Sequence, residues 1–203
     1  MKVSWILFDL GGVLVDWTGP QALRALLPAA AQHPPDSYAQ RWQRCTATDR
    51  FERGAASPLE FAREFADCWG VALPPDEMLA RYVAWLRGFY DGVPALLAAL
   101  RLHARLACLS NTNAAHWDCE VGLGVRAEFE FALASHELQL RKPQADIFAL
   151  ALQRLDAAPE QVLYFDDLAP NVAAARAVGM QAYQVAGLVQ LRQQLAALGL
   201  PHG

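Results

Sequence analysis

The chain shows two different hydrophobic patterns, each in its own part of the sequence. Short apolar runs, typical of strands buried on both faces, occur near the amino terminus and again after residue 103. They cover residues 3–8, 104–109, 128–134, 161–165 and 180–185. Between residues 20 and 89 apolar residues instead recur at spacings of three and four, which indicates amphipathic helices. The pattern predicts one strand, a helical insertion, and then a series of further strands.

Helices are expected between the later strands. Apolar spacing and turn residues predict them at residues 93–103, 114–121, 144–155, 170–178 and 188–198, with Gly179 just past the end of one helix. Strands that alternate with helices form a parallel sheet with right-handed crossovers. We therefore expect an α/β fold, a Rossmann-like doubly wound parallel sheet built from residues 1–16 and 91–203.

The insertion, residues 17–90, is predicted to be a cap domain of four helices without a strand, and residues 13–17 to extend the preceding turn. Ser57 before Pro58, with Glu60 three residues after Ser57, is a typical helix start. The second helix is patterned on Tyr38, Trp42 and Cys45, and the breakers include Pro34-Pro35. Because the insertion leaves directly after the first strand, we expect it to cover the carboxyl edge of the sheet.

Composition narrows the classes of partner. Of the 203 residues 54% are hydrophobic and 19% charged, and the formal net charge is −4, as in a soluble globular protein. The chain has no basic cluster, so nucleic acid is not expected. It has no run of 18 apolar residues, and Asp9 interrupts the apolar amino terminus, so neither a membrane span nor a signal peptide is expected. These features favour a cytoplasmic protein, whose oligomeric state the sequence does not indicate.

The cysteines and histidines do not form a recognisable metal site. The four cysteines form no C-x-x-C pair and are expected to be buried free thiols of a reducing compartment; they are Cys45, Cys68, Cys108 and Cys119. The five histidines lack ligand spacing and are expected at the surface or hydrogen-bonded; they are His33, His103, His116, His136 and His202.

Polar clusters follow the predicted strands or lie in the loops beside them. They are Asp9 with Gly11, Ser110 with Asn111, Lys142 with Pro143, and Asp166 with Asp167. Open α/β sheets bind ligands at the edge where their strands end, so these clusters should meet there. Carboxylates suit Mg²⁺, a lysine suits phosphate oxygens, and an aspartate can be a nucleophile. Each cluster alone is equally compatible with a helix cap, a solvated lysine or a turn.

The clusters in this order resemble the haloacid dehalogenase-like (HAD) hydrolase superfamily over essentially the whole chain. Its four motifs are matched by Phe8-Asp9-Leu10-Gly11-Gly12-Val13-Leu14, Leu109-Ser110-Asn111, Arg141-Lys142-Pro143, and Tyr164-Phe165-Asp166-Asp167 with Asn171 and Gly179. The last three motifs and Phe51-Glu52-Arg53-Gly54 are most similar to one branch. That branch holds bacterial α-D-glucose-1-phosphate phosphatase and the amino-terminal phosphatase-like domain of epoxide hydrolases.

The resemblance implies a Mg²⁺-dependent phosphatase of a small phosphorylated metabolite, such as a sugar phosphate. Asp9 would attack phosphorus and form an aspartyl-phosphate. Mg²⁺ would be held by Asp9, the backbone carbonyl of Gly11 and Asp167, with Asp166 acting directly or through water. The phosphoryl oxygens would be bound by Ser110, Asn111 and Lys142.

Gly11 departs from the commonest form of the first motif, which has a second aspartate there as general acid/base. Loss of such a group typically costs about 10²–10⁴-fold in rate. The similar branch also has glycine at this position. The hypothesis that follows is a substrate with a comparatively acidic leaving group, such as an anomeric sugar hydroxyl or an acyl group.

Two alternatives remain open. A 2-haloacid dehalogenase also lacks the second aspartate but uses no metal and would not need the Asp166-Asp167 pair. A catalytically weak HAD domain could instead serve as a binding module, and Gly11 keeps that alternative open. Substrate choice is expected to lie in the insertion, whose candidate pocket residues are Trp17, Trp42, Phe51 and Arg53.

Overall fold

A parallel sheet forms the centre of the protein. The computed structural model describes residues 3–27, 41–42 and 44–203. Within them five parallel strands lie in the order β5-β4-β1-β6-β7. Their bounds are β1 Trp5–Phe8, β4 Arg105–Ser110, β5 Phe131–Ala134, β6 Val162–Asp166 and β7 Gln181–Gln184. β1 is therefore the central strand, with β4 and β6 as its neighbours.

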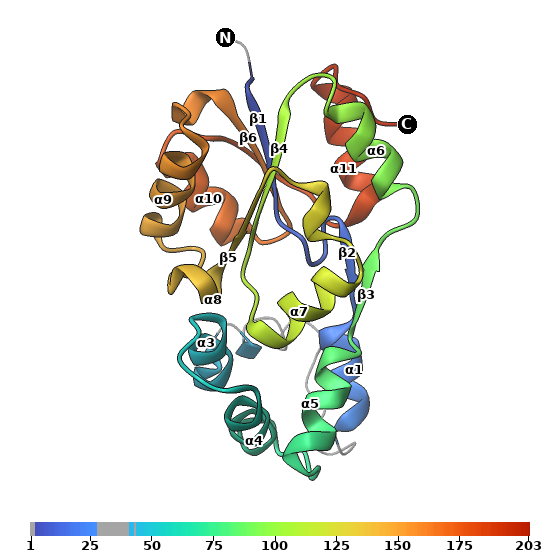
Figure 1. Ribbon diagram of the computed structural model, residues 1–203, viewed down its shortest axis with the longest axis vertical. Helices are drawn as coiled ribbons and strands as arrows, with labels where there is room; N and C mark the ends of the chain where they lie inside the picture. Colours follow the sequence, from blue (N-terminus) through green and yellow to red (C-terminus); the bar gives the residue numbers. More distant parts are fainter. Residues whose placement is uncertain (1–2, 28–40, 43) are drawn as a thin grey trace.

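Helices cover both faces of this sheet. Figure 1 shows α6 (Val93–Leu100) and α11 (Gly187–Ala197) on one side, and α9 (Ala145–Leu155) and α10 (Ala169–Ala177) on the other. Because successive strand residues point to opposite faces, Ile6 and Phe8 pack in the core with α6 and α11, whereas Trp5 and Leu7 pack with α9 and α10. Burial on both faces explains the unbroken apolar run of β1, and the predicted doubly wound α/β fold is confirmed.

The insertion packs around a core of its own beyond the carboxyl ends of the strands (Figure 1). Its helices are α1 Gly19–Leu26, α3 Thr46–Glu52, α4 Pro58–Trp69 and α5 Pro75–Val83. Ser57 and Glu60 form a reciprocal capping box at the start of α4, as predicted. Of the second predicted helix, Tyr38 lies outside the described residues, as do Pro34-Pro35 and His33. The pattern did not separate α3 as a helix, and the boundaries 17–90 stay a prediction.

The expectation of no strand in the insertion is wrong at its end. β2 (Val15–Trp17), expected as turn, pairs antiparallel with β3 (Leu86–Phe89), expected as helix. Gly88 within β3 has a φ of 93°, which a right-handed helix does not allow. Pairing with a segment about 70 residues away satisfies the backbone groups of both strands, and no local pattern reports that partner.

Smaller differences concern the later part of the chain. The strand expected at 128–134 begins only at Phe131, because residues 126–128 form a 3₁₀ turn. The short helix α8 (Ser135–Leu138) was not predicted, whereas α7 (Ala114–Gly122) was.

Cys68 is exposed and Cys119 half-buried, so the expectation of buried thiols holds only for Cys45 and Cys108. No helix in the described part of the chain has the length and apolarity to cross a bilayer.

Candidate active site

A cavity of about 200 Å³ lies between the carboxyl edge of the sheet and the insertion. Among the residues predicted for the site, those that line it are Asp9, Gly11, Ser110, Asn111, Lys142 and Asp167. Asp166 lies behind them and is fully buried. The insertion contributes Trp42, Glu52 and Tyr82 to the lining. Residues from the ends of β1, β4 and β6, from the loop after α8 (Ser135–Leu138) and from the insertion thus meet around one space.

Lys142 binds two carboxylates in this cavity. Its Nζ donates to Oδ1 of Asp9 at 2.9 Å, to Oδ2 of Asp166 at 2.7 Å and to the carbonyl of Leu109 at 2.9 Å. Burial opposes the charged ammonium, but Asp166 and Asp9 outweigh it and raise the pKa of Lys142. Burial raises the pKa of Asp9 to about 7, against the opposing effect of Lys142. A buried cation therefore fixes the position of the Asp9 carboxylate.

Asp166 organises the end of β6. Its carboxylate accepts hydrogen bonds from Lys142, from the hydroxyl of Tyr164, from the backbone N–H of Leu168 and from Nδ2 of Asn171. Both of its oxygens are thus engaged. The carboxylate positions Lys142 and the loop that follows β6, and a metal ion would have to displace these donors to bind it directly.

Asp167 is more accessible and points to a metal site. One carboxylate oxygen each of Asp9, Asp166 and Asp167 lies within 4.8 Å of the others. Burial, followed by the charge of Asp166, raises the pKa of Asp167 to about 6. A cluster of carboxylate oxygens fits Mg²⁺, which takes oxygen ligands. Gly12, with a φ of 76°, leaves room for Asp167, since a Cβ on Gly12 would lie 2.9 Å from its Oδ2.

Asn111 lines the cavity and also contacts the backbone of Lys142. Its Nδ2 donates to the carbonyl of Lys142 at 3.0 Å, and its Oδ1 accepts from the N–H of Lys142 at 2.9 Å. The amide oxygen and one of the two N–H groups of Nδ2 are therefore committed to the Lys142 backbone. The side chain orients Lys142, and the hydroxyl of Ser110, which also lines the cavity, stays available to a ligand.

Of the four residues expected to line the pocket from the insertion, two line the cavity and two do not. Trp17 and Trp42 line the cavity. Phe51 instead stacks on Phe61 in the core of the insertion, with ring centroids 4.3 Å apart. Arg53 pairs with Asp49 at 3.0 Å and donates to Gln144 at 3.0 Å. The expectation is wrong for Phe51 and Arg53, because aromatic and basic residue types alone do not distinguish a pocket from a packed core or a helix surface.

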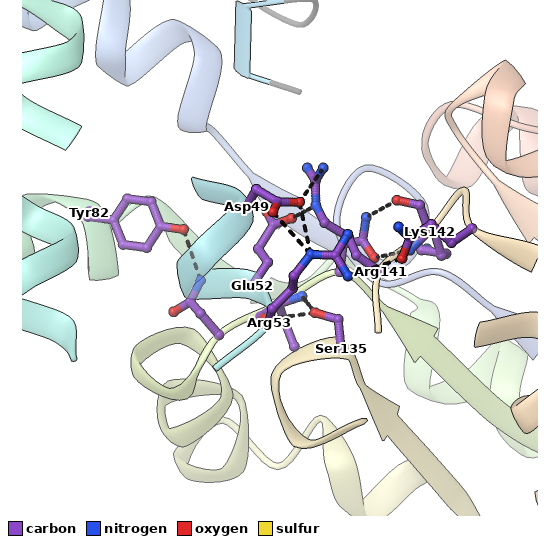
Figure 2. A network of polar contacts seen from close by, with 11 residues as sticks. Asp49, Glu52, Arg53, Tyr82, Ser135, Arg141 and Lys142 are labelled. Carbon is purple, nitrogen blue, oxygen red and sulfur yellow. Dashed lines mark hydrogen bonds and ion pairs between the residues drawn. The ribbon is translucent and has the colours of Figure 1, made fainter. Parts of the chain in front are cut away.

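A nearly buried ion pair joins the insertion to the sheet domain. Nε of Arg141 donates to Oε2 of Glu52, and Nη1 of Arg141 lies 3.7 Å from Oδ1 of Asp49 (Figure 2). Arg141 directly precedes Lys142, whereas Glu52 ends α3 in the insertion. The pair therefore links the position of the insertion to that of Lys142. The sequence showed both residues only as parts of motifs and did not indicate that they touch.

Comparisons with known proteins show the family of the chain and proteins of similar fold. The haloacid dehalogenase-like hydrolase family matches residues 3–179. A D-ribitol-5-phosphate phosphatase of Bacteroides thetaiotaomicron is 26% identical over 95% of this chain and 97% of that protein. A HAD family enzyme of the same organism, solved in complex with magnesium and inorganic phosphate, is 22% identical with a TM-score of 0.69 and covers 90% of this chain and 94% of its own. An L-2-haloacid dehalogenase structure is 26% identical with a TM-score of 0.65, covering 91% and 85%.

Proposed function

Since the chain belongs to the haloacid dehalogenase-like hydrolase family, we propose that it is a phosphatase that hydrolyses a small phosphorylated metabolite through a phosphorylated Asp9. The observation that carries the proposal is the contact between Asp9 and Lys142, beside Asp167 and at the mouth of one cavity. Polyol and sugar phosphates are the first substrates to test, since the D-ribitol-5-phosphate phosphatase matches along nearly the whole chain. The resemblance to the glucose-1-phosphate phosphatase branch stays a prediction.

The residues around the cavity have distinct roles in this proposal. A carboxylate oxygen of Asp9 attacks phosphorus and the bond to the leaving oxygen breaks. Lys142 neutralises the charge that Asp9 and the phosphoryl group bring together, and Ser110 donates to a phosphoryl oxygen. Water then attacks phosphorus and releases phosphate and Asp9. Such catalysis consists mainly of positioning and electrostatic stabilisation.

Asp9, the backbone carbonyl of Gly11 and Asp167 would hold Mg²⁺ in this proposal, with Asp166 behind them. Bound there, the ion would add positive charge where the phosphoryl oxygens gather. The support from this chain is the group of three carboxylates with oxygens within 4.8 Å of one another. A HAD family enzyme of Bacteroides thetaiotaomicron was solved in complex with magnesium and inorganic phosphate, which supports testing both with this chain.

A 2-haloacid dehalogenase is the second candidate, favoured by the similar L-2-haloacid dehalogenase structure. That reaction needs no metal, and it would leave Asp167 and the glycine that makes room for it unexplained. The carboxylate cluster therefore favours the phosphatase.

The test is p-nitrophenyl phosphate hydrolysis with Mg²⁺, compared with the Asp9→Asn variant and with EDTA. We expect hydrolysis by the wild type alone, a loss of activity with EDTA, and phosphate bound to Asp9 in rapidly quenched samples. Equal rates for wild type and Asp9→Asn would exclude Asp9 as the nucleophile, and no hydrolysis by the wild type would favour a binding module. Chloride release from 2-chloropropionate in EDTA would instead establish the dehalogenase.

A further inference from the structure

The proposed reaction requires a proton that Gly11 cannot supply. When a phosphate ester breaks, the leaving oxygen needs a proton, and a positioned acid supplies it in the transition state. Gly11 lines the cavity beside Asp9 but carries no side chain. If no other group took its place, only esters with acidic leaving groups would react well. A replacement would be another titratable group in the cavity, with an atom that is not already hydrogen-bonded.

Most titratable groups that line the cavity are already engaged. Lys142 pairs with Asp9, and Glu52 pairs with Arg141. The Nε2–H of His116 donates to the carbonyl of Tyr82 at 2.9 Å, and burial lowers the pKa of His116 to about 4. At neutral pH this imidazole is uncharged and its one proton is committed.

Apart from Asp167, which is assigned to the metal site, Glu120 is the exception among the described residues that line the cavity. It lies in α7, one helical turn beyond His116, so both side chains are on the same side of the helix. It lines the cavity with 2% of its surface exposed. Its Oε2 is buried and has no hydrogen-bond partner in the part of the chain that the structure describes. A buried polar atom without a partner is costly, so a ligand that completes its hydrogen bonding explains its presence.

We infer that Glu120 is the general acid/base of this enzyme, acting across the cavity in place of the side chain that Gly11 lacks. In the first step Asp9 bonds to phosphorus, the bond to the leaving oxygen breaks, and the carboxyl proton of Glu120 passes to that oxygen. In the second step the Glu120 carboxylate takes a proton from the attacking water. Phosphate leaves, and Asp9 and the Glu120 carboxyl group return to their starting states. This inference rests on the proposed phosphatase function.

The surroundings of Glu120 favour the protonated form that the first step needs. Burial, followed by the charge of Asp9, raises the pKa of Glu120 to about 8, with Arg126 opposing. The other titratable groups that interact with it are Cys108 and Cys119. A carboxyl group that keeps its proton near neutral pH is suited to general acid catalysis.

The test is Glu120→Gln, assayed with p-nitrophenyl phosphate and phenyl phosphate. The two esters are similar in shape, but nitrophenol is a far more acidic leaving group and needs little protonation. We expect Glu120→Gln to release the first equivalent of nitrophenol at near the wild-type rate and then to stall as phosphorylated enzyme. Its first turnover of phenyl phosphate should be about 10²-fold slower or more. Asp118→Asn, which removes an exposed carboxylate from the same helix, should leave both rates unchanged.

A rescue variant separates proton transfer from structural damage. A Cβ on Gly11 would meet nothing closer than Cβ of Trp17 at 3.8 Å, so the first side-chain atom of Gly11→Asp fits at this position. The double variant with Gly11→Asp and Glu120→Gln should hydrolyse phenyl phosphate at least tenfold faster than Glu120→Gln alone.

Equal effects of Glu120→Gln on both esters would overturn the role of Glu120. So would a double variant that stays slow while Gly11→Asp alone is as fast as the wild type. In either case phosphorylation of Asp9 by p-nitrophenyl phosphate would still support the phosphatase, so the two proposals can fail separately.

Discussion

The ammonium of Lys142 lies 2.9 Å from Oδ1 of Asp9, and both side chains are buried. The same ammonium lies 2.7 Å from Oδ2 of Asp166. One cation therefore compensates two carboxylates at the point where β1 and β6 end. Without it, two negative charges would face each other in a space that water scarcely enters.

Lys142→Met should therefore affect both catalysis and stability. Loss of one positioned donor commonly lowers kcat by about 10²–10³, and removal of one partner from a buried ion pair costs about 3–5 kcal/mol. Burial makes the Asp9 carboxylate bind its proton more tightly in the folded than in the unfolded state, and Lys142 opposes this effect. The stability loss should therefore be larger at pH 8 than at pH 5. Urea unfolding at both pH values measures it, and a loss independent of pH would contradict the pairing.

Gly12→Ala and Gly70→Ala form a matched pair. Gly12 has a φ of 76° and Gly70 a φ of 70°. An alanine in this left-handed region costs about 1 kcal/mol of stability at either position. At Gly12 the new Cβ would also lie 2.9 Å from Oδ2 of Asp167, whereas at Gly70 it would meet nothing within 4 Å. We expect Gly12→Ala alone to lose activity, by about 10²-fold, and to need more Mg²⁺. Equal activity of the two variants would show that Asp167 can shift without consequence.

Glu52→Gln should loosen the attachment of the insertion. The side chains of Glu52 and Arg141 are almost fully buried and form an ion pair (Figure 2). The neutral glutamine leaves the Arg141 charge largely uncompensated, at a cost of about 3 kcal/mol. Glu77→Gln removes the partner of Arg81 from an exposed pair and should change stability by about 0.5 kcal/mol or less. Urea unfolding of the two variants gives the comparison, and similar midpoints would mean that the buried pair adds nothing.

Glu120 should make the stability of the protein depend on pH. Its pKa of about 8 in the folded state lies above the ordinary value of 4.5. Between these values the folded protein holds a proton that the unfolded chain has lost, so the free energy of unfolding falls as pH rises. Glu120→Gln does not titrate. Its stability relative to wild type should grow by a few kcal/mol from pH 5 to pH 9, since one pKa unit is worth about 1.4 kcal/mol. A constant difference across this range would indicate an ordinary Glu120 pKa.

The position of the site could be predicted because it depends on local signals. The apolar run before Asp9 and the one before Asp166 each predict a buried strand, and parallel strands end at one edge. The residues that follow them therefore had to be neighbours. Their individual partners could not be predicted in this way, since nothing in the pattern indicates that the Asn111 amide contacts the backbone of Lys142.

The secondary structure of β2 and β3 could not be predicted from local patterns either, because each strand depends on a distant partner. Spacings of three and four around Trp85 and Phe89 favour a helix, and only the pairing of Leu86–Phe89 with Val15–Trp17 makes it a strand. Nothing in the sequence indicated a functional role for Glu120, because a glutamate on a short helix is normally solvated.

The sheet, the helical insertion and the set of residues at the sheet edge could be predicted from local patterns, since hydrophobic period and strand ends are properties of neighbouring residues. The tertiary structure decided which oxygens are free, which are committed and which carboxyl groups are removed from water. Those properties depend on contacts such as that between Glu52 and Arg141, 89 residues apart, and on burial that arises only when the insertion closes over the sheet.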